Sequence, residues 1–357
     1  MTTSSSLIVI GAGITGLSIA AVAQSRGVDV TVIAREAADA TASGVAAGMV
    51  APALEALTEH EPELAFARLK AAEQLWHAQS EAWGPELAAL IARAAATADS
   101  RYVWPQSDNA SDLTTPRLHD MGVTFRALTD DELLPVASDC DGVRVDGDWL
   151  VPAGRVLDLL TARITGAGGR MITGAVTAVT ARSATLDSGE VLKADHVAVA
   201  AGYGAAALAA DVPPLNALSP IKGHLLALKG QGSTGVLRSP LGYLADHETT
   251  AKFGATMQFG ETGTAIEPAA VDDLKARARQ ILPDLDLSQT EPRAGVRAST
   301  PDGWPMIGRD PRSGVLVAVG MRRNGYIFAP MAARIVTALI LDEALPDDAV
   351  FYRPGRF

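Results

Sequence analysis

The sequence predicts an α/β protein in which an α+β part, built on an antiparallel sheet, is interleaved with a part built on parallel strands. Two observations predict this class. A glycine-rich strand–helix–strand pattern occupies residues 7–33, and short apolar segments separated by turn residues occupy residues 215–265. The chain has 357 residues, which is enough for one large domain or two interleaved ones.

Composition argues against several classes of function. Lys and Arg number 30 against 41 Asp and Glu, so the net charge is -11 and we expect no nucleic-acid partner. The single cysteine, Cys140, allows no intrachain disulfide, and the six histidines never fall at zinc-binding spacings, so we expect no bound metal. The apolar residues 7–24 contain glycines and follow no basic residue, so we expect a cytoplasmic protein without an integral membrane segment.

The first element of the chain is a strand over residues 7–10, rich in β-branched side chains. A helix over residues 17–26 and a second strand over residues 28–33 follow it. In such a unit, glycines turn the chain, let backbone N–H groups approach a pyrophosphate, and pack helix on strand. The pattern predicts a Rossmann-like dinucleotide site made by Gly11, Ala12, Gly13, Ile14, Thr15 and Gly16.

The end of the second strand leaves the cofactor open on the residues alone. A typical unit has an acidic residue there for the ribose, whereas this chain has Ala34-Arg35-Glu36. An arginine at this point favours the 2′-phosphate of NADP, so an NADP-dependent reductase is one alternative. A non-catalytic nucleotide-binding regulatory module is another, because a fold does not determine a function.

The next segment, residues 41–52, is small and nearly uncharged, so its backbone could lie against a flat ring. From Val32 to Met49 the sequence resembles the FAD-binding start of the D-amino-acid oxidase and glycine oxidase family, which also tolerates an Ala-Arg pair at this strand end. The resemblance implies FAD rather than NADP. The cofactor contacts that it implies here are Ala34, Arg35, Thr41, Ala42, Ser43, Ala46, Ala47, Gly48 and Met49.

The middle of the chain continues with helices and strands. Residues 61–96 predict two or more helices broken near Gly84-Pro85, and a further helix is predicted over residues 154–166. Strands are predicted over residues 170–184 and 191–208. The resemblance extends to these strands and implies cofactor contacts at Val176, through its backbone to adenine, and at Ala201 and Gly202.

Two C-terminal segments carry the strongest resemblance. Residues 295–308 are similar to the G-[LV]-R-x-x-T-x-D-G-x-P-x-I-G stretch of glycine oxidases. Residues 320–330, followed by a helix to about residue 342, are similar to the final flavin-contacting segment of the family. The positive end of that helix would face the flavin ring. The cofactor contacts implied here are Arg323, Asn324, Gly325, Tyr326 and Ile327.

The candidate catalytic residues are Arg297 and Tyr243. The resemblance singles them out, because Arg297 lies in the glycine oxidase stretch and the family has a substrate tyrosine at the point that matches Tyr243. A guanidinium presents a planar fork that binds a carboxylate through two hydrogen bonds, and a tyrosine hydroxyl on the predicted sheet could donate to the same carboxylate. The resemblance adds Arg323 as a substrate contact, with the neighbouring Arg322 as the competing candidate. It also adds two apolar pocket residues, which are Met49 and Met257.

Two departures from the family pattern affect the expected pocket. Tyr243-Leu244 is followed by Ala245-Asp246-His247 where the family usually has Pro-Arg, and Met321 replaces a common histidine. We therefore expect a different pocket mouth.

The resemblance implies an FAD-dependent oxidoreductase that deaminates a small amino acid or amine of the glycine, sarcosine or D-amino-acid type. Hydride would pass from Cα to flavin N5, the imine would hydrolyse to a 2-oxo acid, and O2 or another acceptor would reoxidise the flavin. A homo-oligomer is left open. We expect residues 1–85, 146–214 and 293–357 to form the FAD-binding domain and residues 86–145 and 215–292 the substrate-binding domain.

Overall fold

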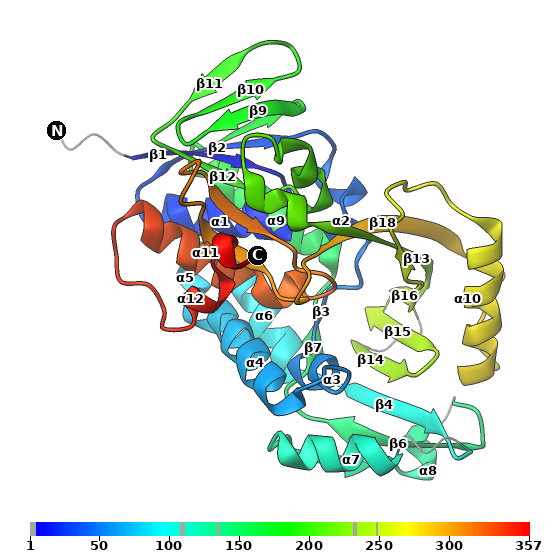
Figure 1. Cartoon of the computed structure of the whole chain (residues 1–357). Helices are drawn as coiled ribbons and strands as arrows, with labels where there is room; N and C mark the ends of the chain where they lie inside the picture. The colour runs from blue at the N-terminus through cyan, green and yellow to red at the C-terminus, as the bar shows by residue number, and fades with distance from the viewer. Residues whose placement is uncertain (1–4, 108–110, 134–135, 231–233, 248) are drawn as a thin grey trace.

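The computed structural model describes residues 5–107, 111–133, 136–230, 234–247 and 249–357. Its described elements include two large sheets, which Figure 1 shows in different parts of the molecule. Among the described residues, no helix has both the length and the apolar character needed to cross a membrane.

The first large sheet has six strands and carries the predicted glycine-rich unit. Neighbouring strands are parallel except for one antiparallel pair at the edge, β19 with β20. Most of its central side chains are buried, as expected for a parallel sheet covered on both faces. The strands across the sheet are β19 (Met306–Arg309), β20 (Leu316–Val319), β12 (His196–Val199), β1 (Ser6–Ile10), β2 (Asp29–Ala34) and β8 (Arg170–Thr173).

Helices from both ends of the chain pack together beside this sheet. Helix α1 (Ile14–Ser25) is buried along almost its whole length and lies against α11 (Gly325–Ile340) and α9 (Ala153–Gly166). The predicted helical region comprises α4 (Pro62–Ala78), α5 (Ser80–Trp83) and α6 (Pro85–Ala96), with the break at Gly84. Gly84 has φ 78°, which other residues rarely adopt.

The second large sheet contains the predicted antiparallel segments. All its strand pairs are antiparallel except β14 with β4. Through this pair, the strands between residues 100 and 145 extend the sheet beyond the region that the sequence predicted. Helix α10 (Pro268–Ile281) packs on β13 and β16. The strands are β17 (Gln258–Phe259), β13 (Ser219–Lys229), β16 (Thr250–Gly254), β15 (Gly242–His247), β14 (Thr234–Ser239), β4 (Ser100–Pro105), β6 (Cys140–Val145) and β5 (Phe125–Ala127), with β18 (Glu291–Ser299) paired to β13.

One predicted strand is wrong in part. Residues 191–208 were expected to be extended, but β11 (Val191–Lys193) and β12 are followed by the 3₁₀-helix η2 (Gly202–Leu208). Strand β12 ends at Val199, Gly202 begins the 3₁₀-helix with φ 55°, and the alanines after it favour a helical turn. Strand β11 belongs to a small separate sheet with β9 (Val176–Thr180) and β10 (Ser183–Leu186).

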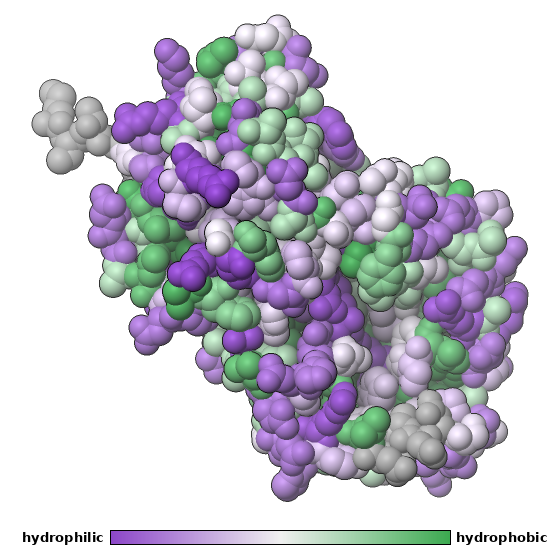
Figure 2. All heavy atoms as spheres, in the orientation of Figure 1, coloured by the Kyte–Doolittle hydropathy of each residue, from purple (hydrophilic) through white to green (hydrophobic). Residues whose placement is uncertain are grey.

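Short elements complete the described structure. They are β3 (Met49–Val50), β7 (Trp149–Leu150), α2 (Ala42–Val45), α3 (Pro52–Ala56), α7 (Ser111–Asp120), α8 (Asp130–Leu133), α12 (Ala349–Tyr352), η1 (Ala38–Ala40), η3 (Pro213–Ala217) and η4 (Pro354–Arg356). On the face shown in Figure 2, hydrophilic side chains cover most of the surface and apolar side chains form small separate patches.

Candidate active site

The turn between β1 and α1 and the first turn of α1 each accept only glycine at one position. Gly11 has φ 113°, and a Cβ there would lie 2.5 Å from the carbonyl oxygen of Ala200. A Cβ on Gly16 would overlap the carbonyl oxygen of Gly11. These close approaches bring β1, α1 and β12 together as a dinucleotide-binding turn requires.

The N-terminus of α1 opens into the site. No side chain caps Gly13, and the first turn carries no acidic residue. The backbone N–H of Ile14 donates to Ser43 Oγ at 3.0 Å, so a hydroxyl already occupies part of this N-terminus. The free N–H groups and the positive end of the helix dipole suit an anion such as a pyrophosphate.

The small-residue loop (residues 41–49) is held by side chains from the second sheet. Lys252 on β16 donates to three successive loop carbonyls, those of Gly44 at 3.1 Å, Val45 at 3.0 Å and Ala46 at 2.6 Å. Nε2 of His247 on β15 lies 3.0 Å from the carbonyl oxygen of Ala47. Burial lowers the pKa of Lys252 to about 8.

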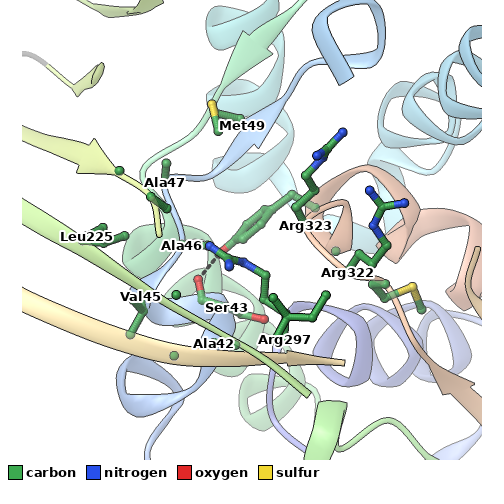
Figure 3. Close-up of a pocket in the computed structure, with 18 of the residues that line it drawn as sticks. Ala42, Ser43, Val45, Ala46, Ala47, Met49, Leu225, Arg297, Arg322 and Arg323 are labelled. Carbon is green, nitrogen blue, oxygen red and sulfur yellow. Dashed lines mark hydrogen bonds between the residues drawn. The ribbon is translucent and has the colours of Figure 1, made fainter. Parts of the chain in front are cut away.

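A cavity of about 570 Å³ lies between this loop, the α1 turn and the second sheet. Figure 3 shows part of its lining, with Arg297 extending from its strand and Arg322 and Arg323 on a separate segment. The residues predicted as site residues that line it are Gly13, Ile14, Thr15, Ala42, Ser43, Ala46, Ala47, Gly48, Met49, Gly202, Tyr243, Met257, Arg297, Arg323, Gly325 and Tyr326.

The other predicted cofactor residues do not line this cavity. They are Gly11, Ala12, Gly16, Ala34, Arg35, Thr41, Val176, Ala201, Asn324 and Ile327. The Arg35 side chain is 71% exposed and pairs with Glu36 at 2.6 Å. Val176 begins β9 in the small three-stranded sheet.

Arg297 reaches the cavity from β18, over the backbone of Gly223 on β13. A Cβ on Gly223 would overlap its guanidinium, so the glycine makes room for it. Nη1 of Arg297 donates to the carbonyl oxygen of Thr256 at 3.4 Å. Among the described residues, no carboxylate lies within 4.0 Å of this guanidinium. Burial lowers the pKa of Arg297, because removing the guanidinium from water disfavours its charged form.

Tyr243 lies on β15, and its hydroxyl is close to Gly254, which lines the cavity. A Cβ on Gly254 would lie 3.0 Å from this hydroxyl. Burial raises the pKa of Tyr243, while the nearby charge of Arg297 opposes that rise. The hydroxyl therefore stays protonated at neutral pH and can donate a hydrogen bond.

The remaining arginines around the cavity are paired with carboxylates. Glu55, which is 4% exposed, accepts hydrogen bonds from Arg238 and Arg323. Burial alone would raise the pKa of Glu55, but Arg238 and Arg323 together lower it to about 2. Arg322 pairs with Glu59 at 3.2 Å, so both candidates of the Arg322-Arg323 pair have acidic partners.

The departures from the family pattern have structural consequences at different places. Met321 lines the cavity. Asp246 is buried on β15, outside the lining, and the neighbouring His247 contacts the small-residue loop. Sequence reasoning missed Glu55 and Arg238, because neither lies in a recognisable motif and only the fold brings α3 and β14 together.

Comparison with known proteins identifies the family. A model of the FAD-dependent oxidoreductase (DAO) family matches residues 6–339. This chain belongs to that family. Membership makes it an FAD-dependent oxidoreductase and removes the support for the NADP-dependent and non-catalytic alternatives.

Several of the curated proteins that are similar to this chain are bifunctional proteins. The chain is 30% identical, over 95% of its length, to the tRNA 5-methylaminomethyl-2-thiouridine biosynthesis bifunctional protein of Caulobacter vibrioides, covering 55% of that protein. It is 30% identical to glycine oxidase of Bacillus subtilis over 45% of each chain. The chain thus spans about half the length of these curated relatives.

Solved structures of the family share the fold. Glycine oxidase from Geobacillus kaustophilus matches with a TM-score of 0.83 at 21% identity, over 99% of this chain and 100% of that chain. Iminodiacetate oxidase from a Chelativorans species matches with a TM-score of 0.80 at 21% identity, over 98% of both chains. The predicted fold class is therefore confirmed.

Proposed function

We propose that the protein oxidises the amine of a small amino acid or secondary amine whose carboxylate binds Arg297. The observation that carries this proposal is the state of Arg297. It is a partly buried cation in the cavity, and the described residues offer it one carbonyl and no carboxylate. A buried charge is stable only with a partner, and a planar guanidinium fits a carboxylate best.

The residues present fit FAD. The N-terminus of α1 would hold the pyrophosphate beside Ser43, and the small-residue loop and residues 320–326 would border the ring. FAD would supply the redox chemistry by accepting the equivalent of a hydride from the substrate.

The role of the protein side chains is to position the substrate. Arg297 and Tyr243 would fix the carboxylate, and Met49 and Met257 would provide apolar walls. The lining of the described cavity contains no histidine, and its one carboxylate, Glu55, has a pKa of about 2 and two arginine partners. Glu55 is therefore a poor base, and the substrate amine should react in its neutral form.

The proposed products follow from this chemistry. Loss of a hydride from Cα and a proton from nitrogen leaves an imine, which water converts to a 2-oxo acid and ammonia or an amine. The electrons pass to O2, giving hydrogen peroxide, or to another acceptor. We also retain, as a proposal, the division into an FAD-binding part and a substrate-binding part at the boundaries predicted from the sequence.

The visible spectrum of the purified holoenzyme tests this function. Anaerobic addition of glycine, sarcosine, and D- and L-amino acids in turn should bleach the flavin bands with at least one of them. Arg297→Met should remove the bleaching at the same substrate concentration. A flavin spectrum that no member of the panel bleaches would reject the proposed substrate class while leaving the family unchanged.

A further inference from the structure

A buried polar cluster lies beside the cavity and has no part in the chemistry proposed above. Lys222, His224 and Thr256 are all less than 8% exposed. Side chains alternate along β13, so Lys222 and His224 project to the opposite face from Gly223, the residue under the Arg297 guanidinium. Polar groups at such burial are costly unless they are hydrogen-bonded, so their partners indicate what the cluster holds in place.

Thr256 is bound to His224 by three hydrogen bonds. The backbone N–H of Thr256 donates to the carbonyl oxygen of His224 at 3.1 Å. In return, the backbone N–H of His224 donates to Thr256 Oγ1 at 2.8 Å, and His224 Nδ1 lies 3.2 Å from the same hydroxyl. Thr256 therefore has one position relative to β13.

The other side of His224 is also held. Its Nε2 lies 3.3 Å from the backbone nitrogen of Glu267. The Glu267 carboxylate forms an ion pair with Lys222 and accepts from Gln258 Nε2 at 2.6 Å. The imidazole of His224 is thereby fixed between Thr256 and the residue that precedes α10.

The hydrogen-bonded chain ends at Arg297. The carbonyl oxygen of Thr256 accepts from Arg297 Nη1 at 3.4 Å, and this is the one hydrogen bond recorded for that guanidinium among the described residues. Arg322 and Arg323, in contrast, are oriented by acidic partners. The orientation of Arg297 thus depends on where Thr256 places its carbonyl group.

We propose that Thr256, fixed by His224, is a positioning residue that orients the Arg297 guanidinium for the substrate carboxylate. This inference rests on the proposed function, because it assumes that Arg297 binds a carboxylate. A two-point hydrogen bond is sensitive to the direction of the guanidinium plane, and a misplacement of about 1 Å can cost a large factor in rate.

The experiment compares Thr256→Val with Thr256→Ser in the holoenzyme. Valine matches threonine in shape but lacks the hydroxyl, whereas serine keeps it. Thr256→Val should raise KM for the amino-acid substrate at least about tenfold and leave kcat within about twofold, and Thr256→Ser should stay near the wild-type values. The methyl ester of the same substrate, which has no carboxylate, should show no difference between the variants.

A second measurement does not depend on turnover. Acetate should perturb the visible spectrum of the oxidised flavin, with a higher dissociation constant in Thr256→Val than in Thr256→Ser. Should Thr256→Val fail to retain flavin, His224→Leu takes its place. It removes the Nδ1 contact to Thr256 and the Nε2 contact to Glu267 but keeps the backbone N–H bond to Thr256 Oγ1, so it should raise both constants by a smaller factor.

The outcomes separate this inference from the proposed function. The positioning role would be overturned if Thr256→Val raised KM equally for the acid and the ester, or if the valine and serine variants had equal KM values. If Arg297→Met still abolished acetate binding, the carboxylate role of Arg297 would stand. Wild-type acetate binding in Arg297→Met would overturn the carboxylate role of Arg297, and the positioning role with it.

Discussion

Arg297 differs from the other arginines of the cavity in having no acidic partner among the described residues. The contrast with Arg323 is informative, because both are partly buried and both were predicted as substrate contacts. Arg323 uses its donors on Glu55, Thr58 and Glu59. At the scale of single residues, an arginine with carboxylate partners, such as Arg323, has a structural role, whereas Arg297 has donors left for a ligand.

The first prediction concerns Arg297. Arg297→Lys keeps the charge but loses the planar fork, and Arg297→Met loses both. We expect the methionine variant to raise KM by roughly 30-fold or more, since losing a buried charge pair costs about 2 kcal/mol or more. The lysine variant should lie between methionine and wild type. Steady-state kinetics at fixed pH measures both, and an unchanged KM in the methionine variant would contradict the assignment.

The second prediction concerns Glu55. Replacing it with glutamine removes the buried anion that Arg238 and Arg323 share, leaving Arg323 with Glu59 alone, and should cost about 3 to 5 kcal/mol of unfolding free energy. Urea denaturation measures the loss, with Glu59→Gln as the control, because Glu59 is more exposed and should cost less.

The pH dependence of the same residue has a definite sign. The folded-state pKa of Glu55, about 2, lies below its usual value of 4.5, so the stability that it contributes is complete above pH 4.5 and is lost as the pH falls towards 2. Wild type should therefore lose stability in this range more steeply than Glu55→Gln. Parallel losses in the two proteins would mean that the ion pairs do not produce the low pKa.

At the scale of elements, the small-residue loop depends on strands far from it in sequence. Helix α2 has four residues and could not hold its position by itself. Lys252 binds the carbonyl groups at its C-terminal end, where a cation also opposes the negative end of the helix dipole. The second sheet therefore shapes the part of the cavity that would face the flavin.

Lys252→Met should loosen this loop and weaken FAD retention. Removing the ammonium group leaves three carbonyl oxygens without their donor, and each lost hydrogen bond costs about 1 kcal/mol. Repeated dilution and filtration, followed by the ratio of flavin to protein absorbance, measures retention. Lys193→Met, on exposed β11, serves as the control and should retain FAD as wild type does.

At the scale of the whole molecule, segments from the N-terminus, the middle and the C-terminus build one cavity. Gly13 lies near the start of the chain, Tyr243 in the second sheet, and Tyr326 near the C-terminal end. The Tyr326 hydroxyl donates to the carbonyl oxygen of Ser43 at 3.0 Å, which joins α11 to the small-residue loop. A ligand that fills the cavity should therefore stabilise the folded chain as a unit.

FAD at 100 times its dissociation constant should stabilise the protein by about 2.7 kcal/mol, and the melting temperature should rise accordingly. Differential scanning calorimetry of the apoprotein with FAD or with NADP measures the effect. NADP should leave the melting temperature unchanged, and a rise with NADP but not with FAD would contradict the assigned cofactor.

The glycine-rich turn, the helical region broken at Gly84 and the C-terminal helix could all be predicted from local patterns. Each depends on a property of a short stretch of chain, such as the positive φ that Gly11 can adopt or the spacing of apolar residues. The strand expected over residues 191–208 was wrong in its second half, because apolar composition alone does not distinguish a strand from a 3₁₀-helix.

The sequence by itself determined that the chain carries a dinucleotide-binding turn and that Arg297 and Tyr243 are candidates for a carboxylate. Glycine and arginine act there through their own stereochemistry and charge. Only the tertiary structure decided which arginines are paired, that Lys252 holds the small-residue loop, and that His224 and Thr256 support Arg297. These features depend on contacts between segments far apart in the chain, and such contacts exist only after both sheets have formed.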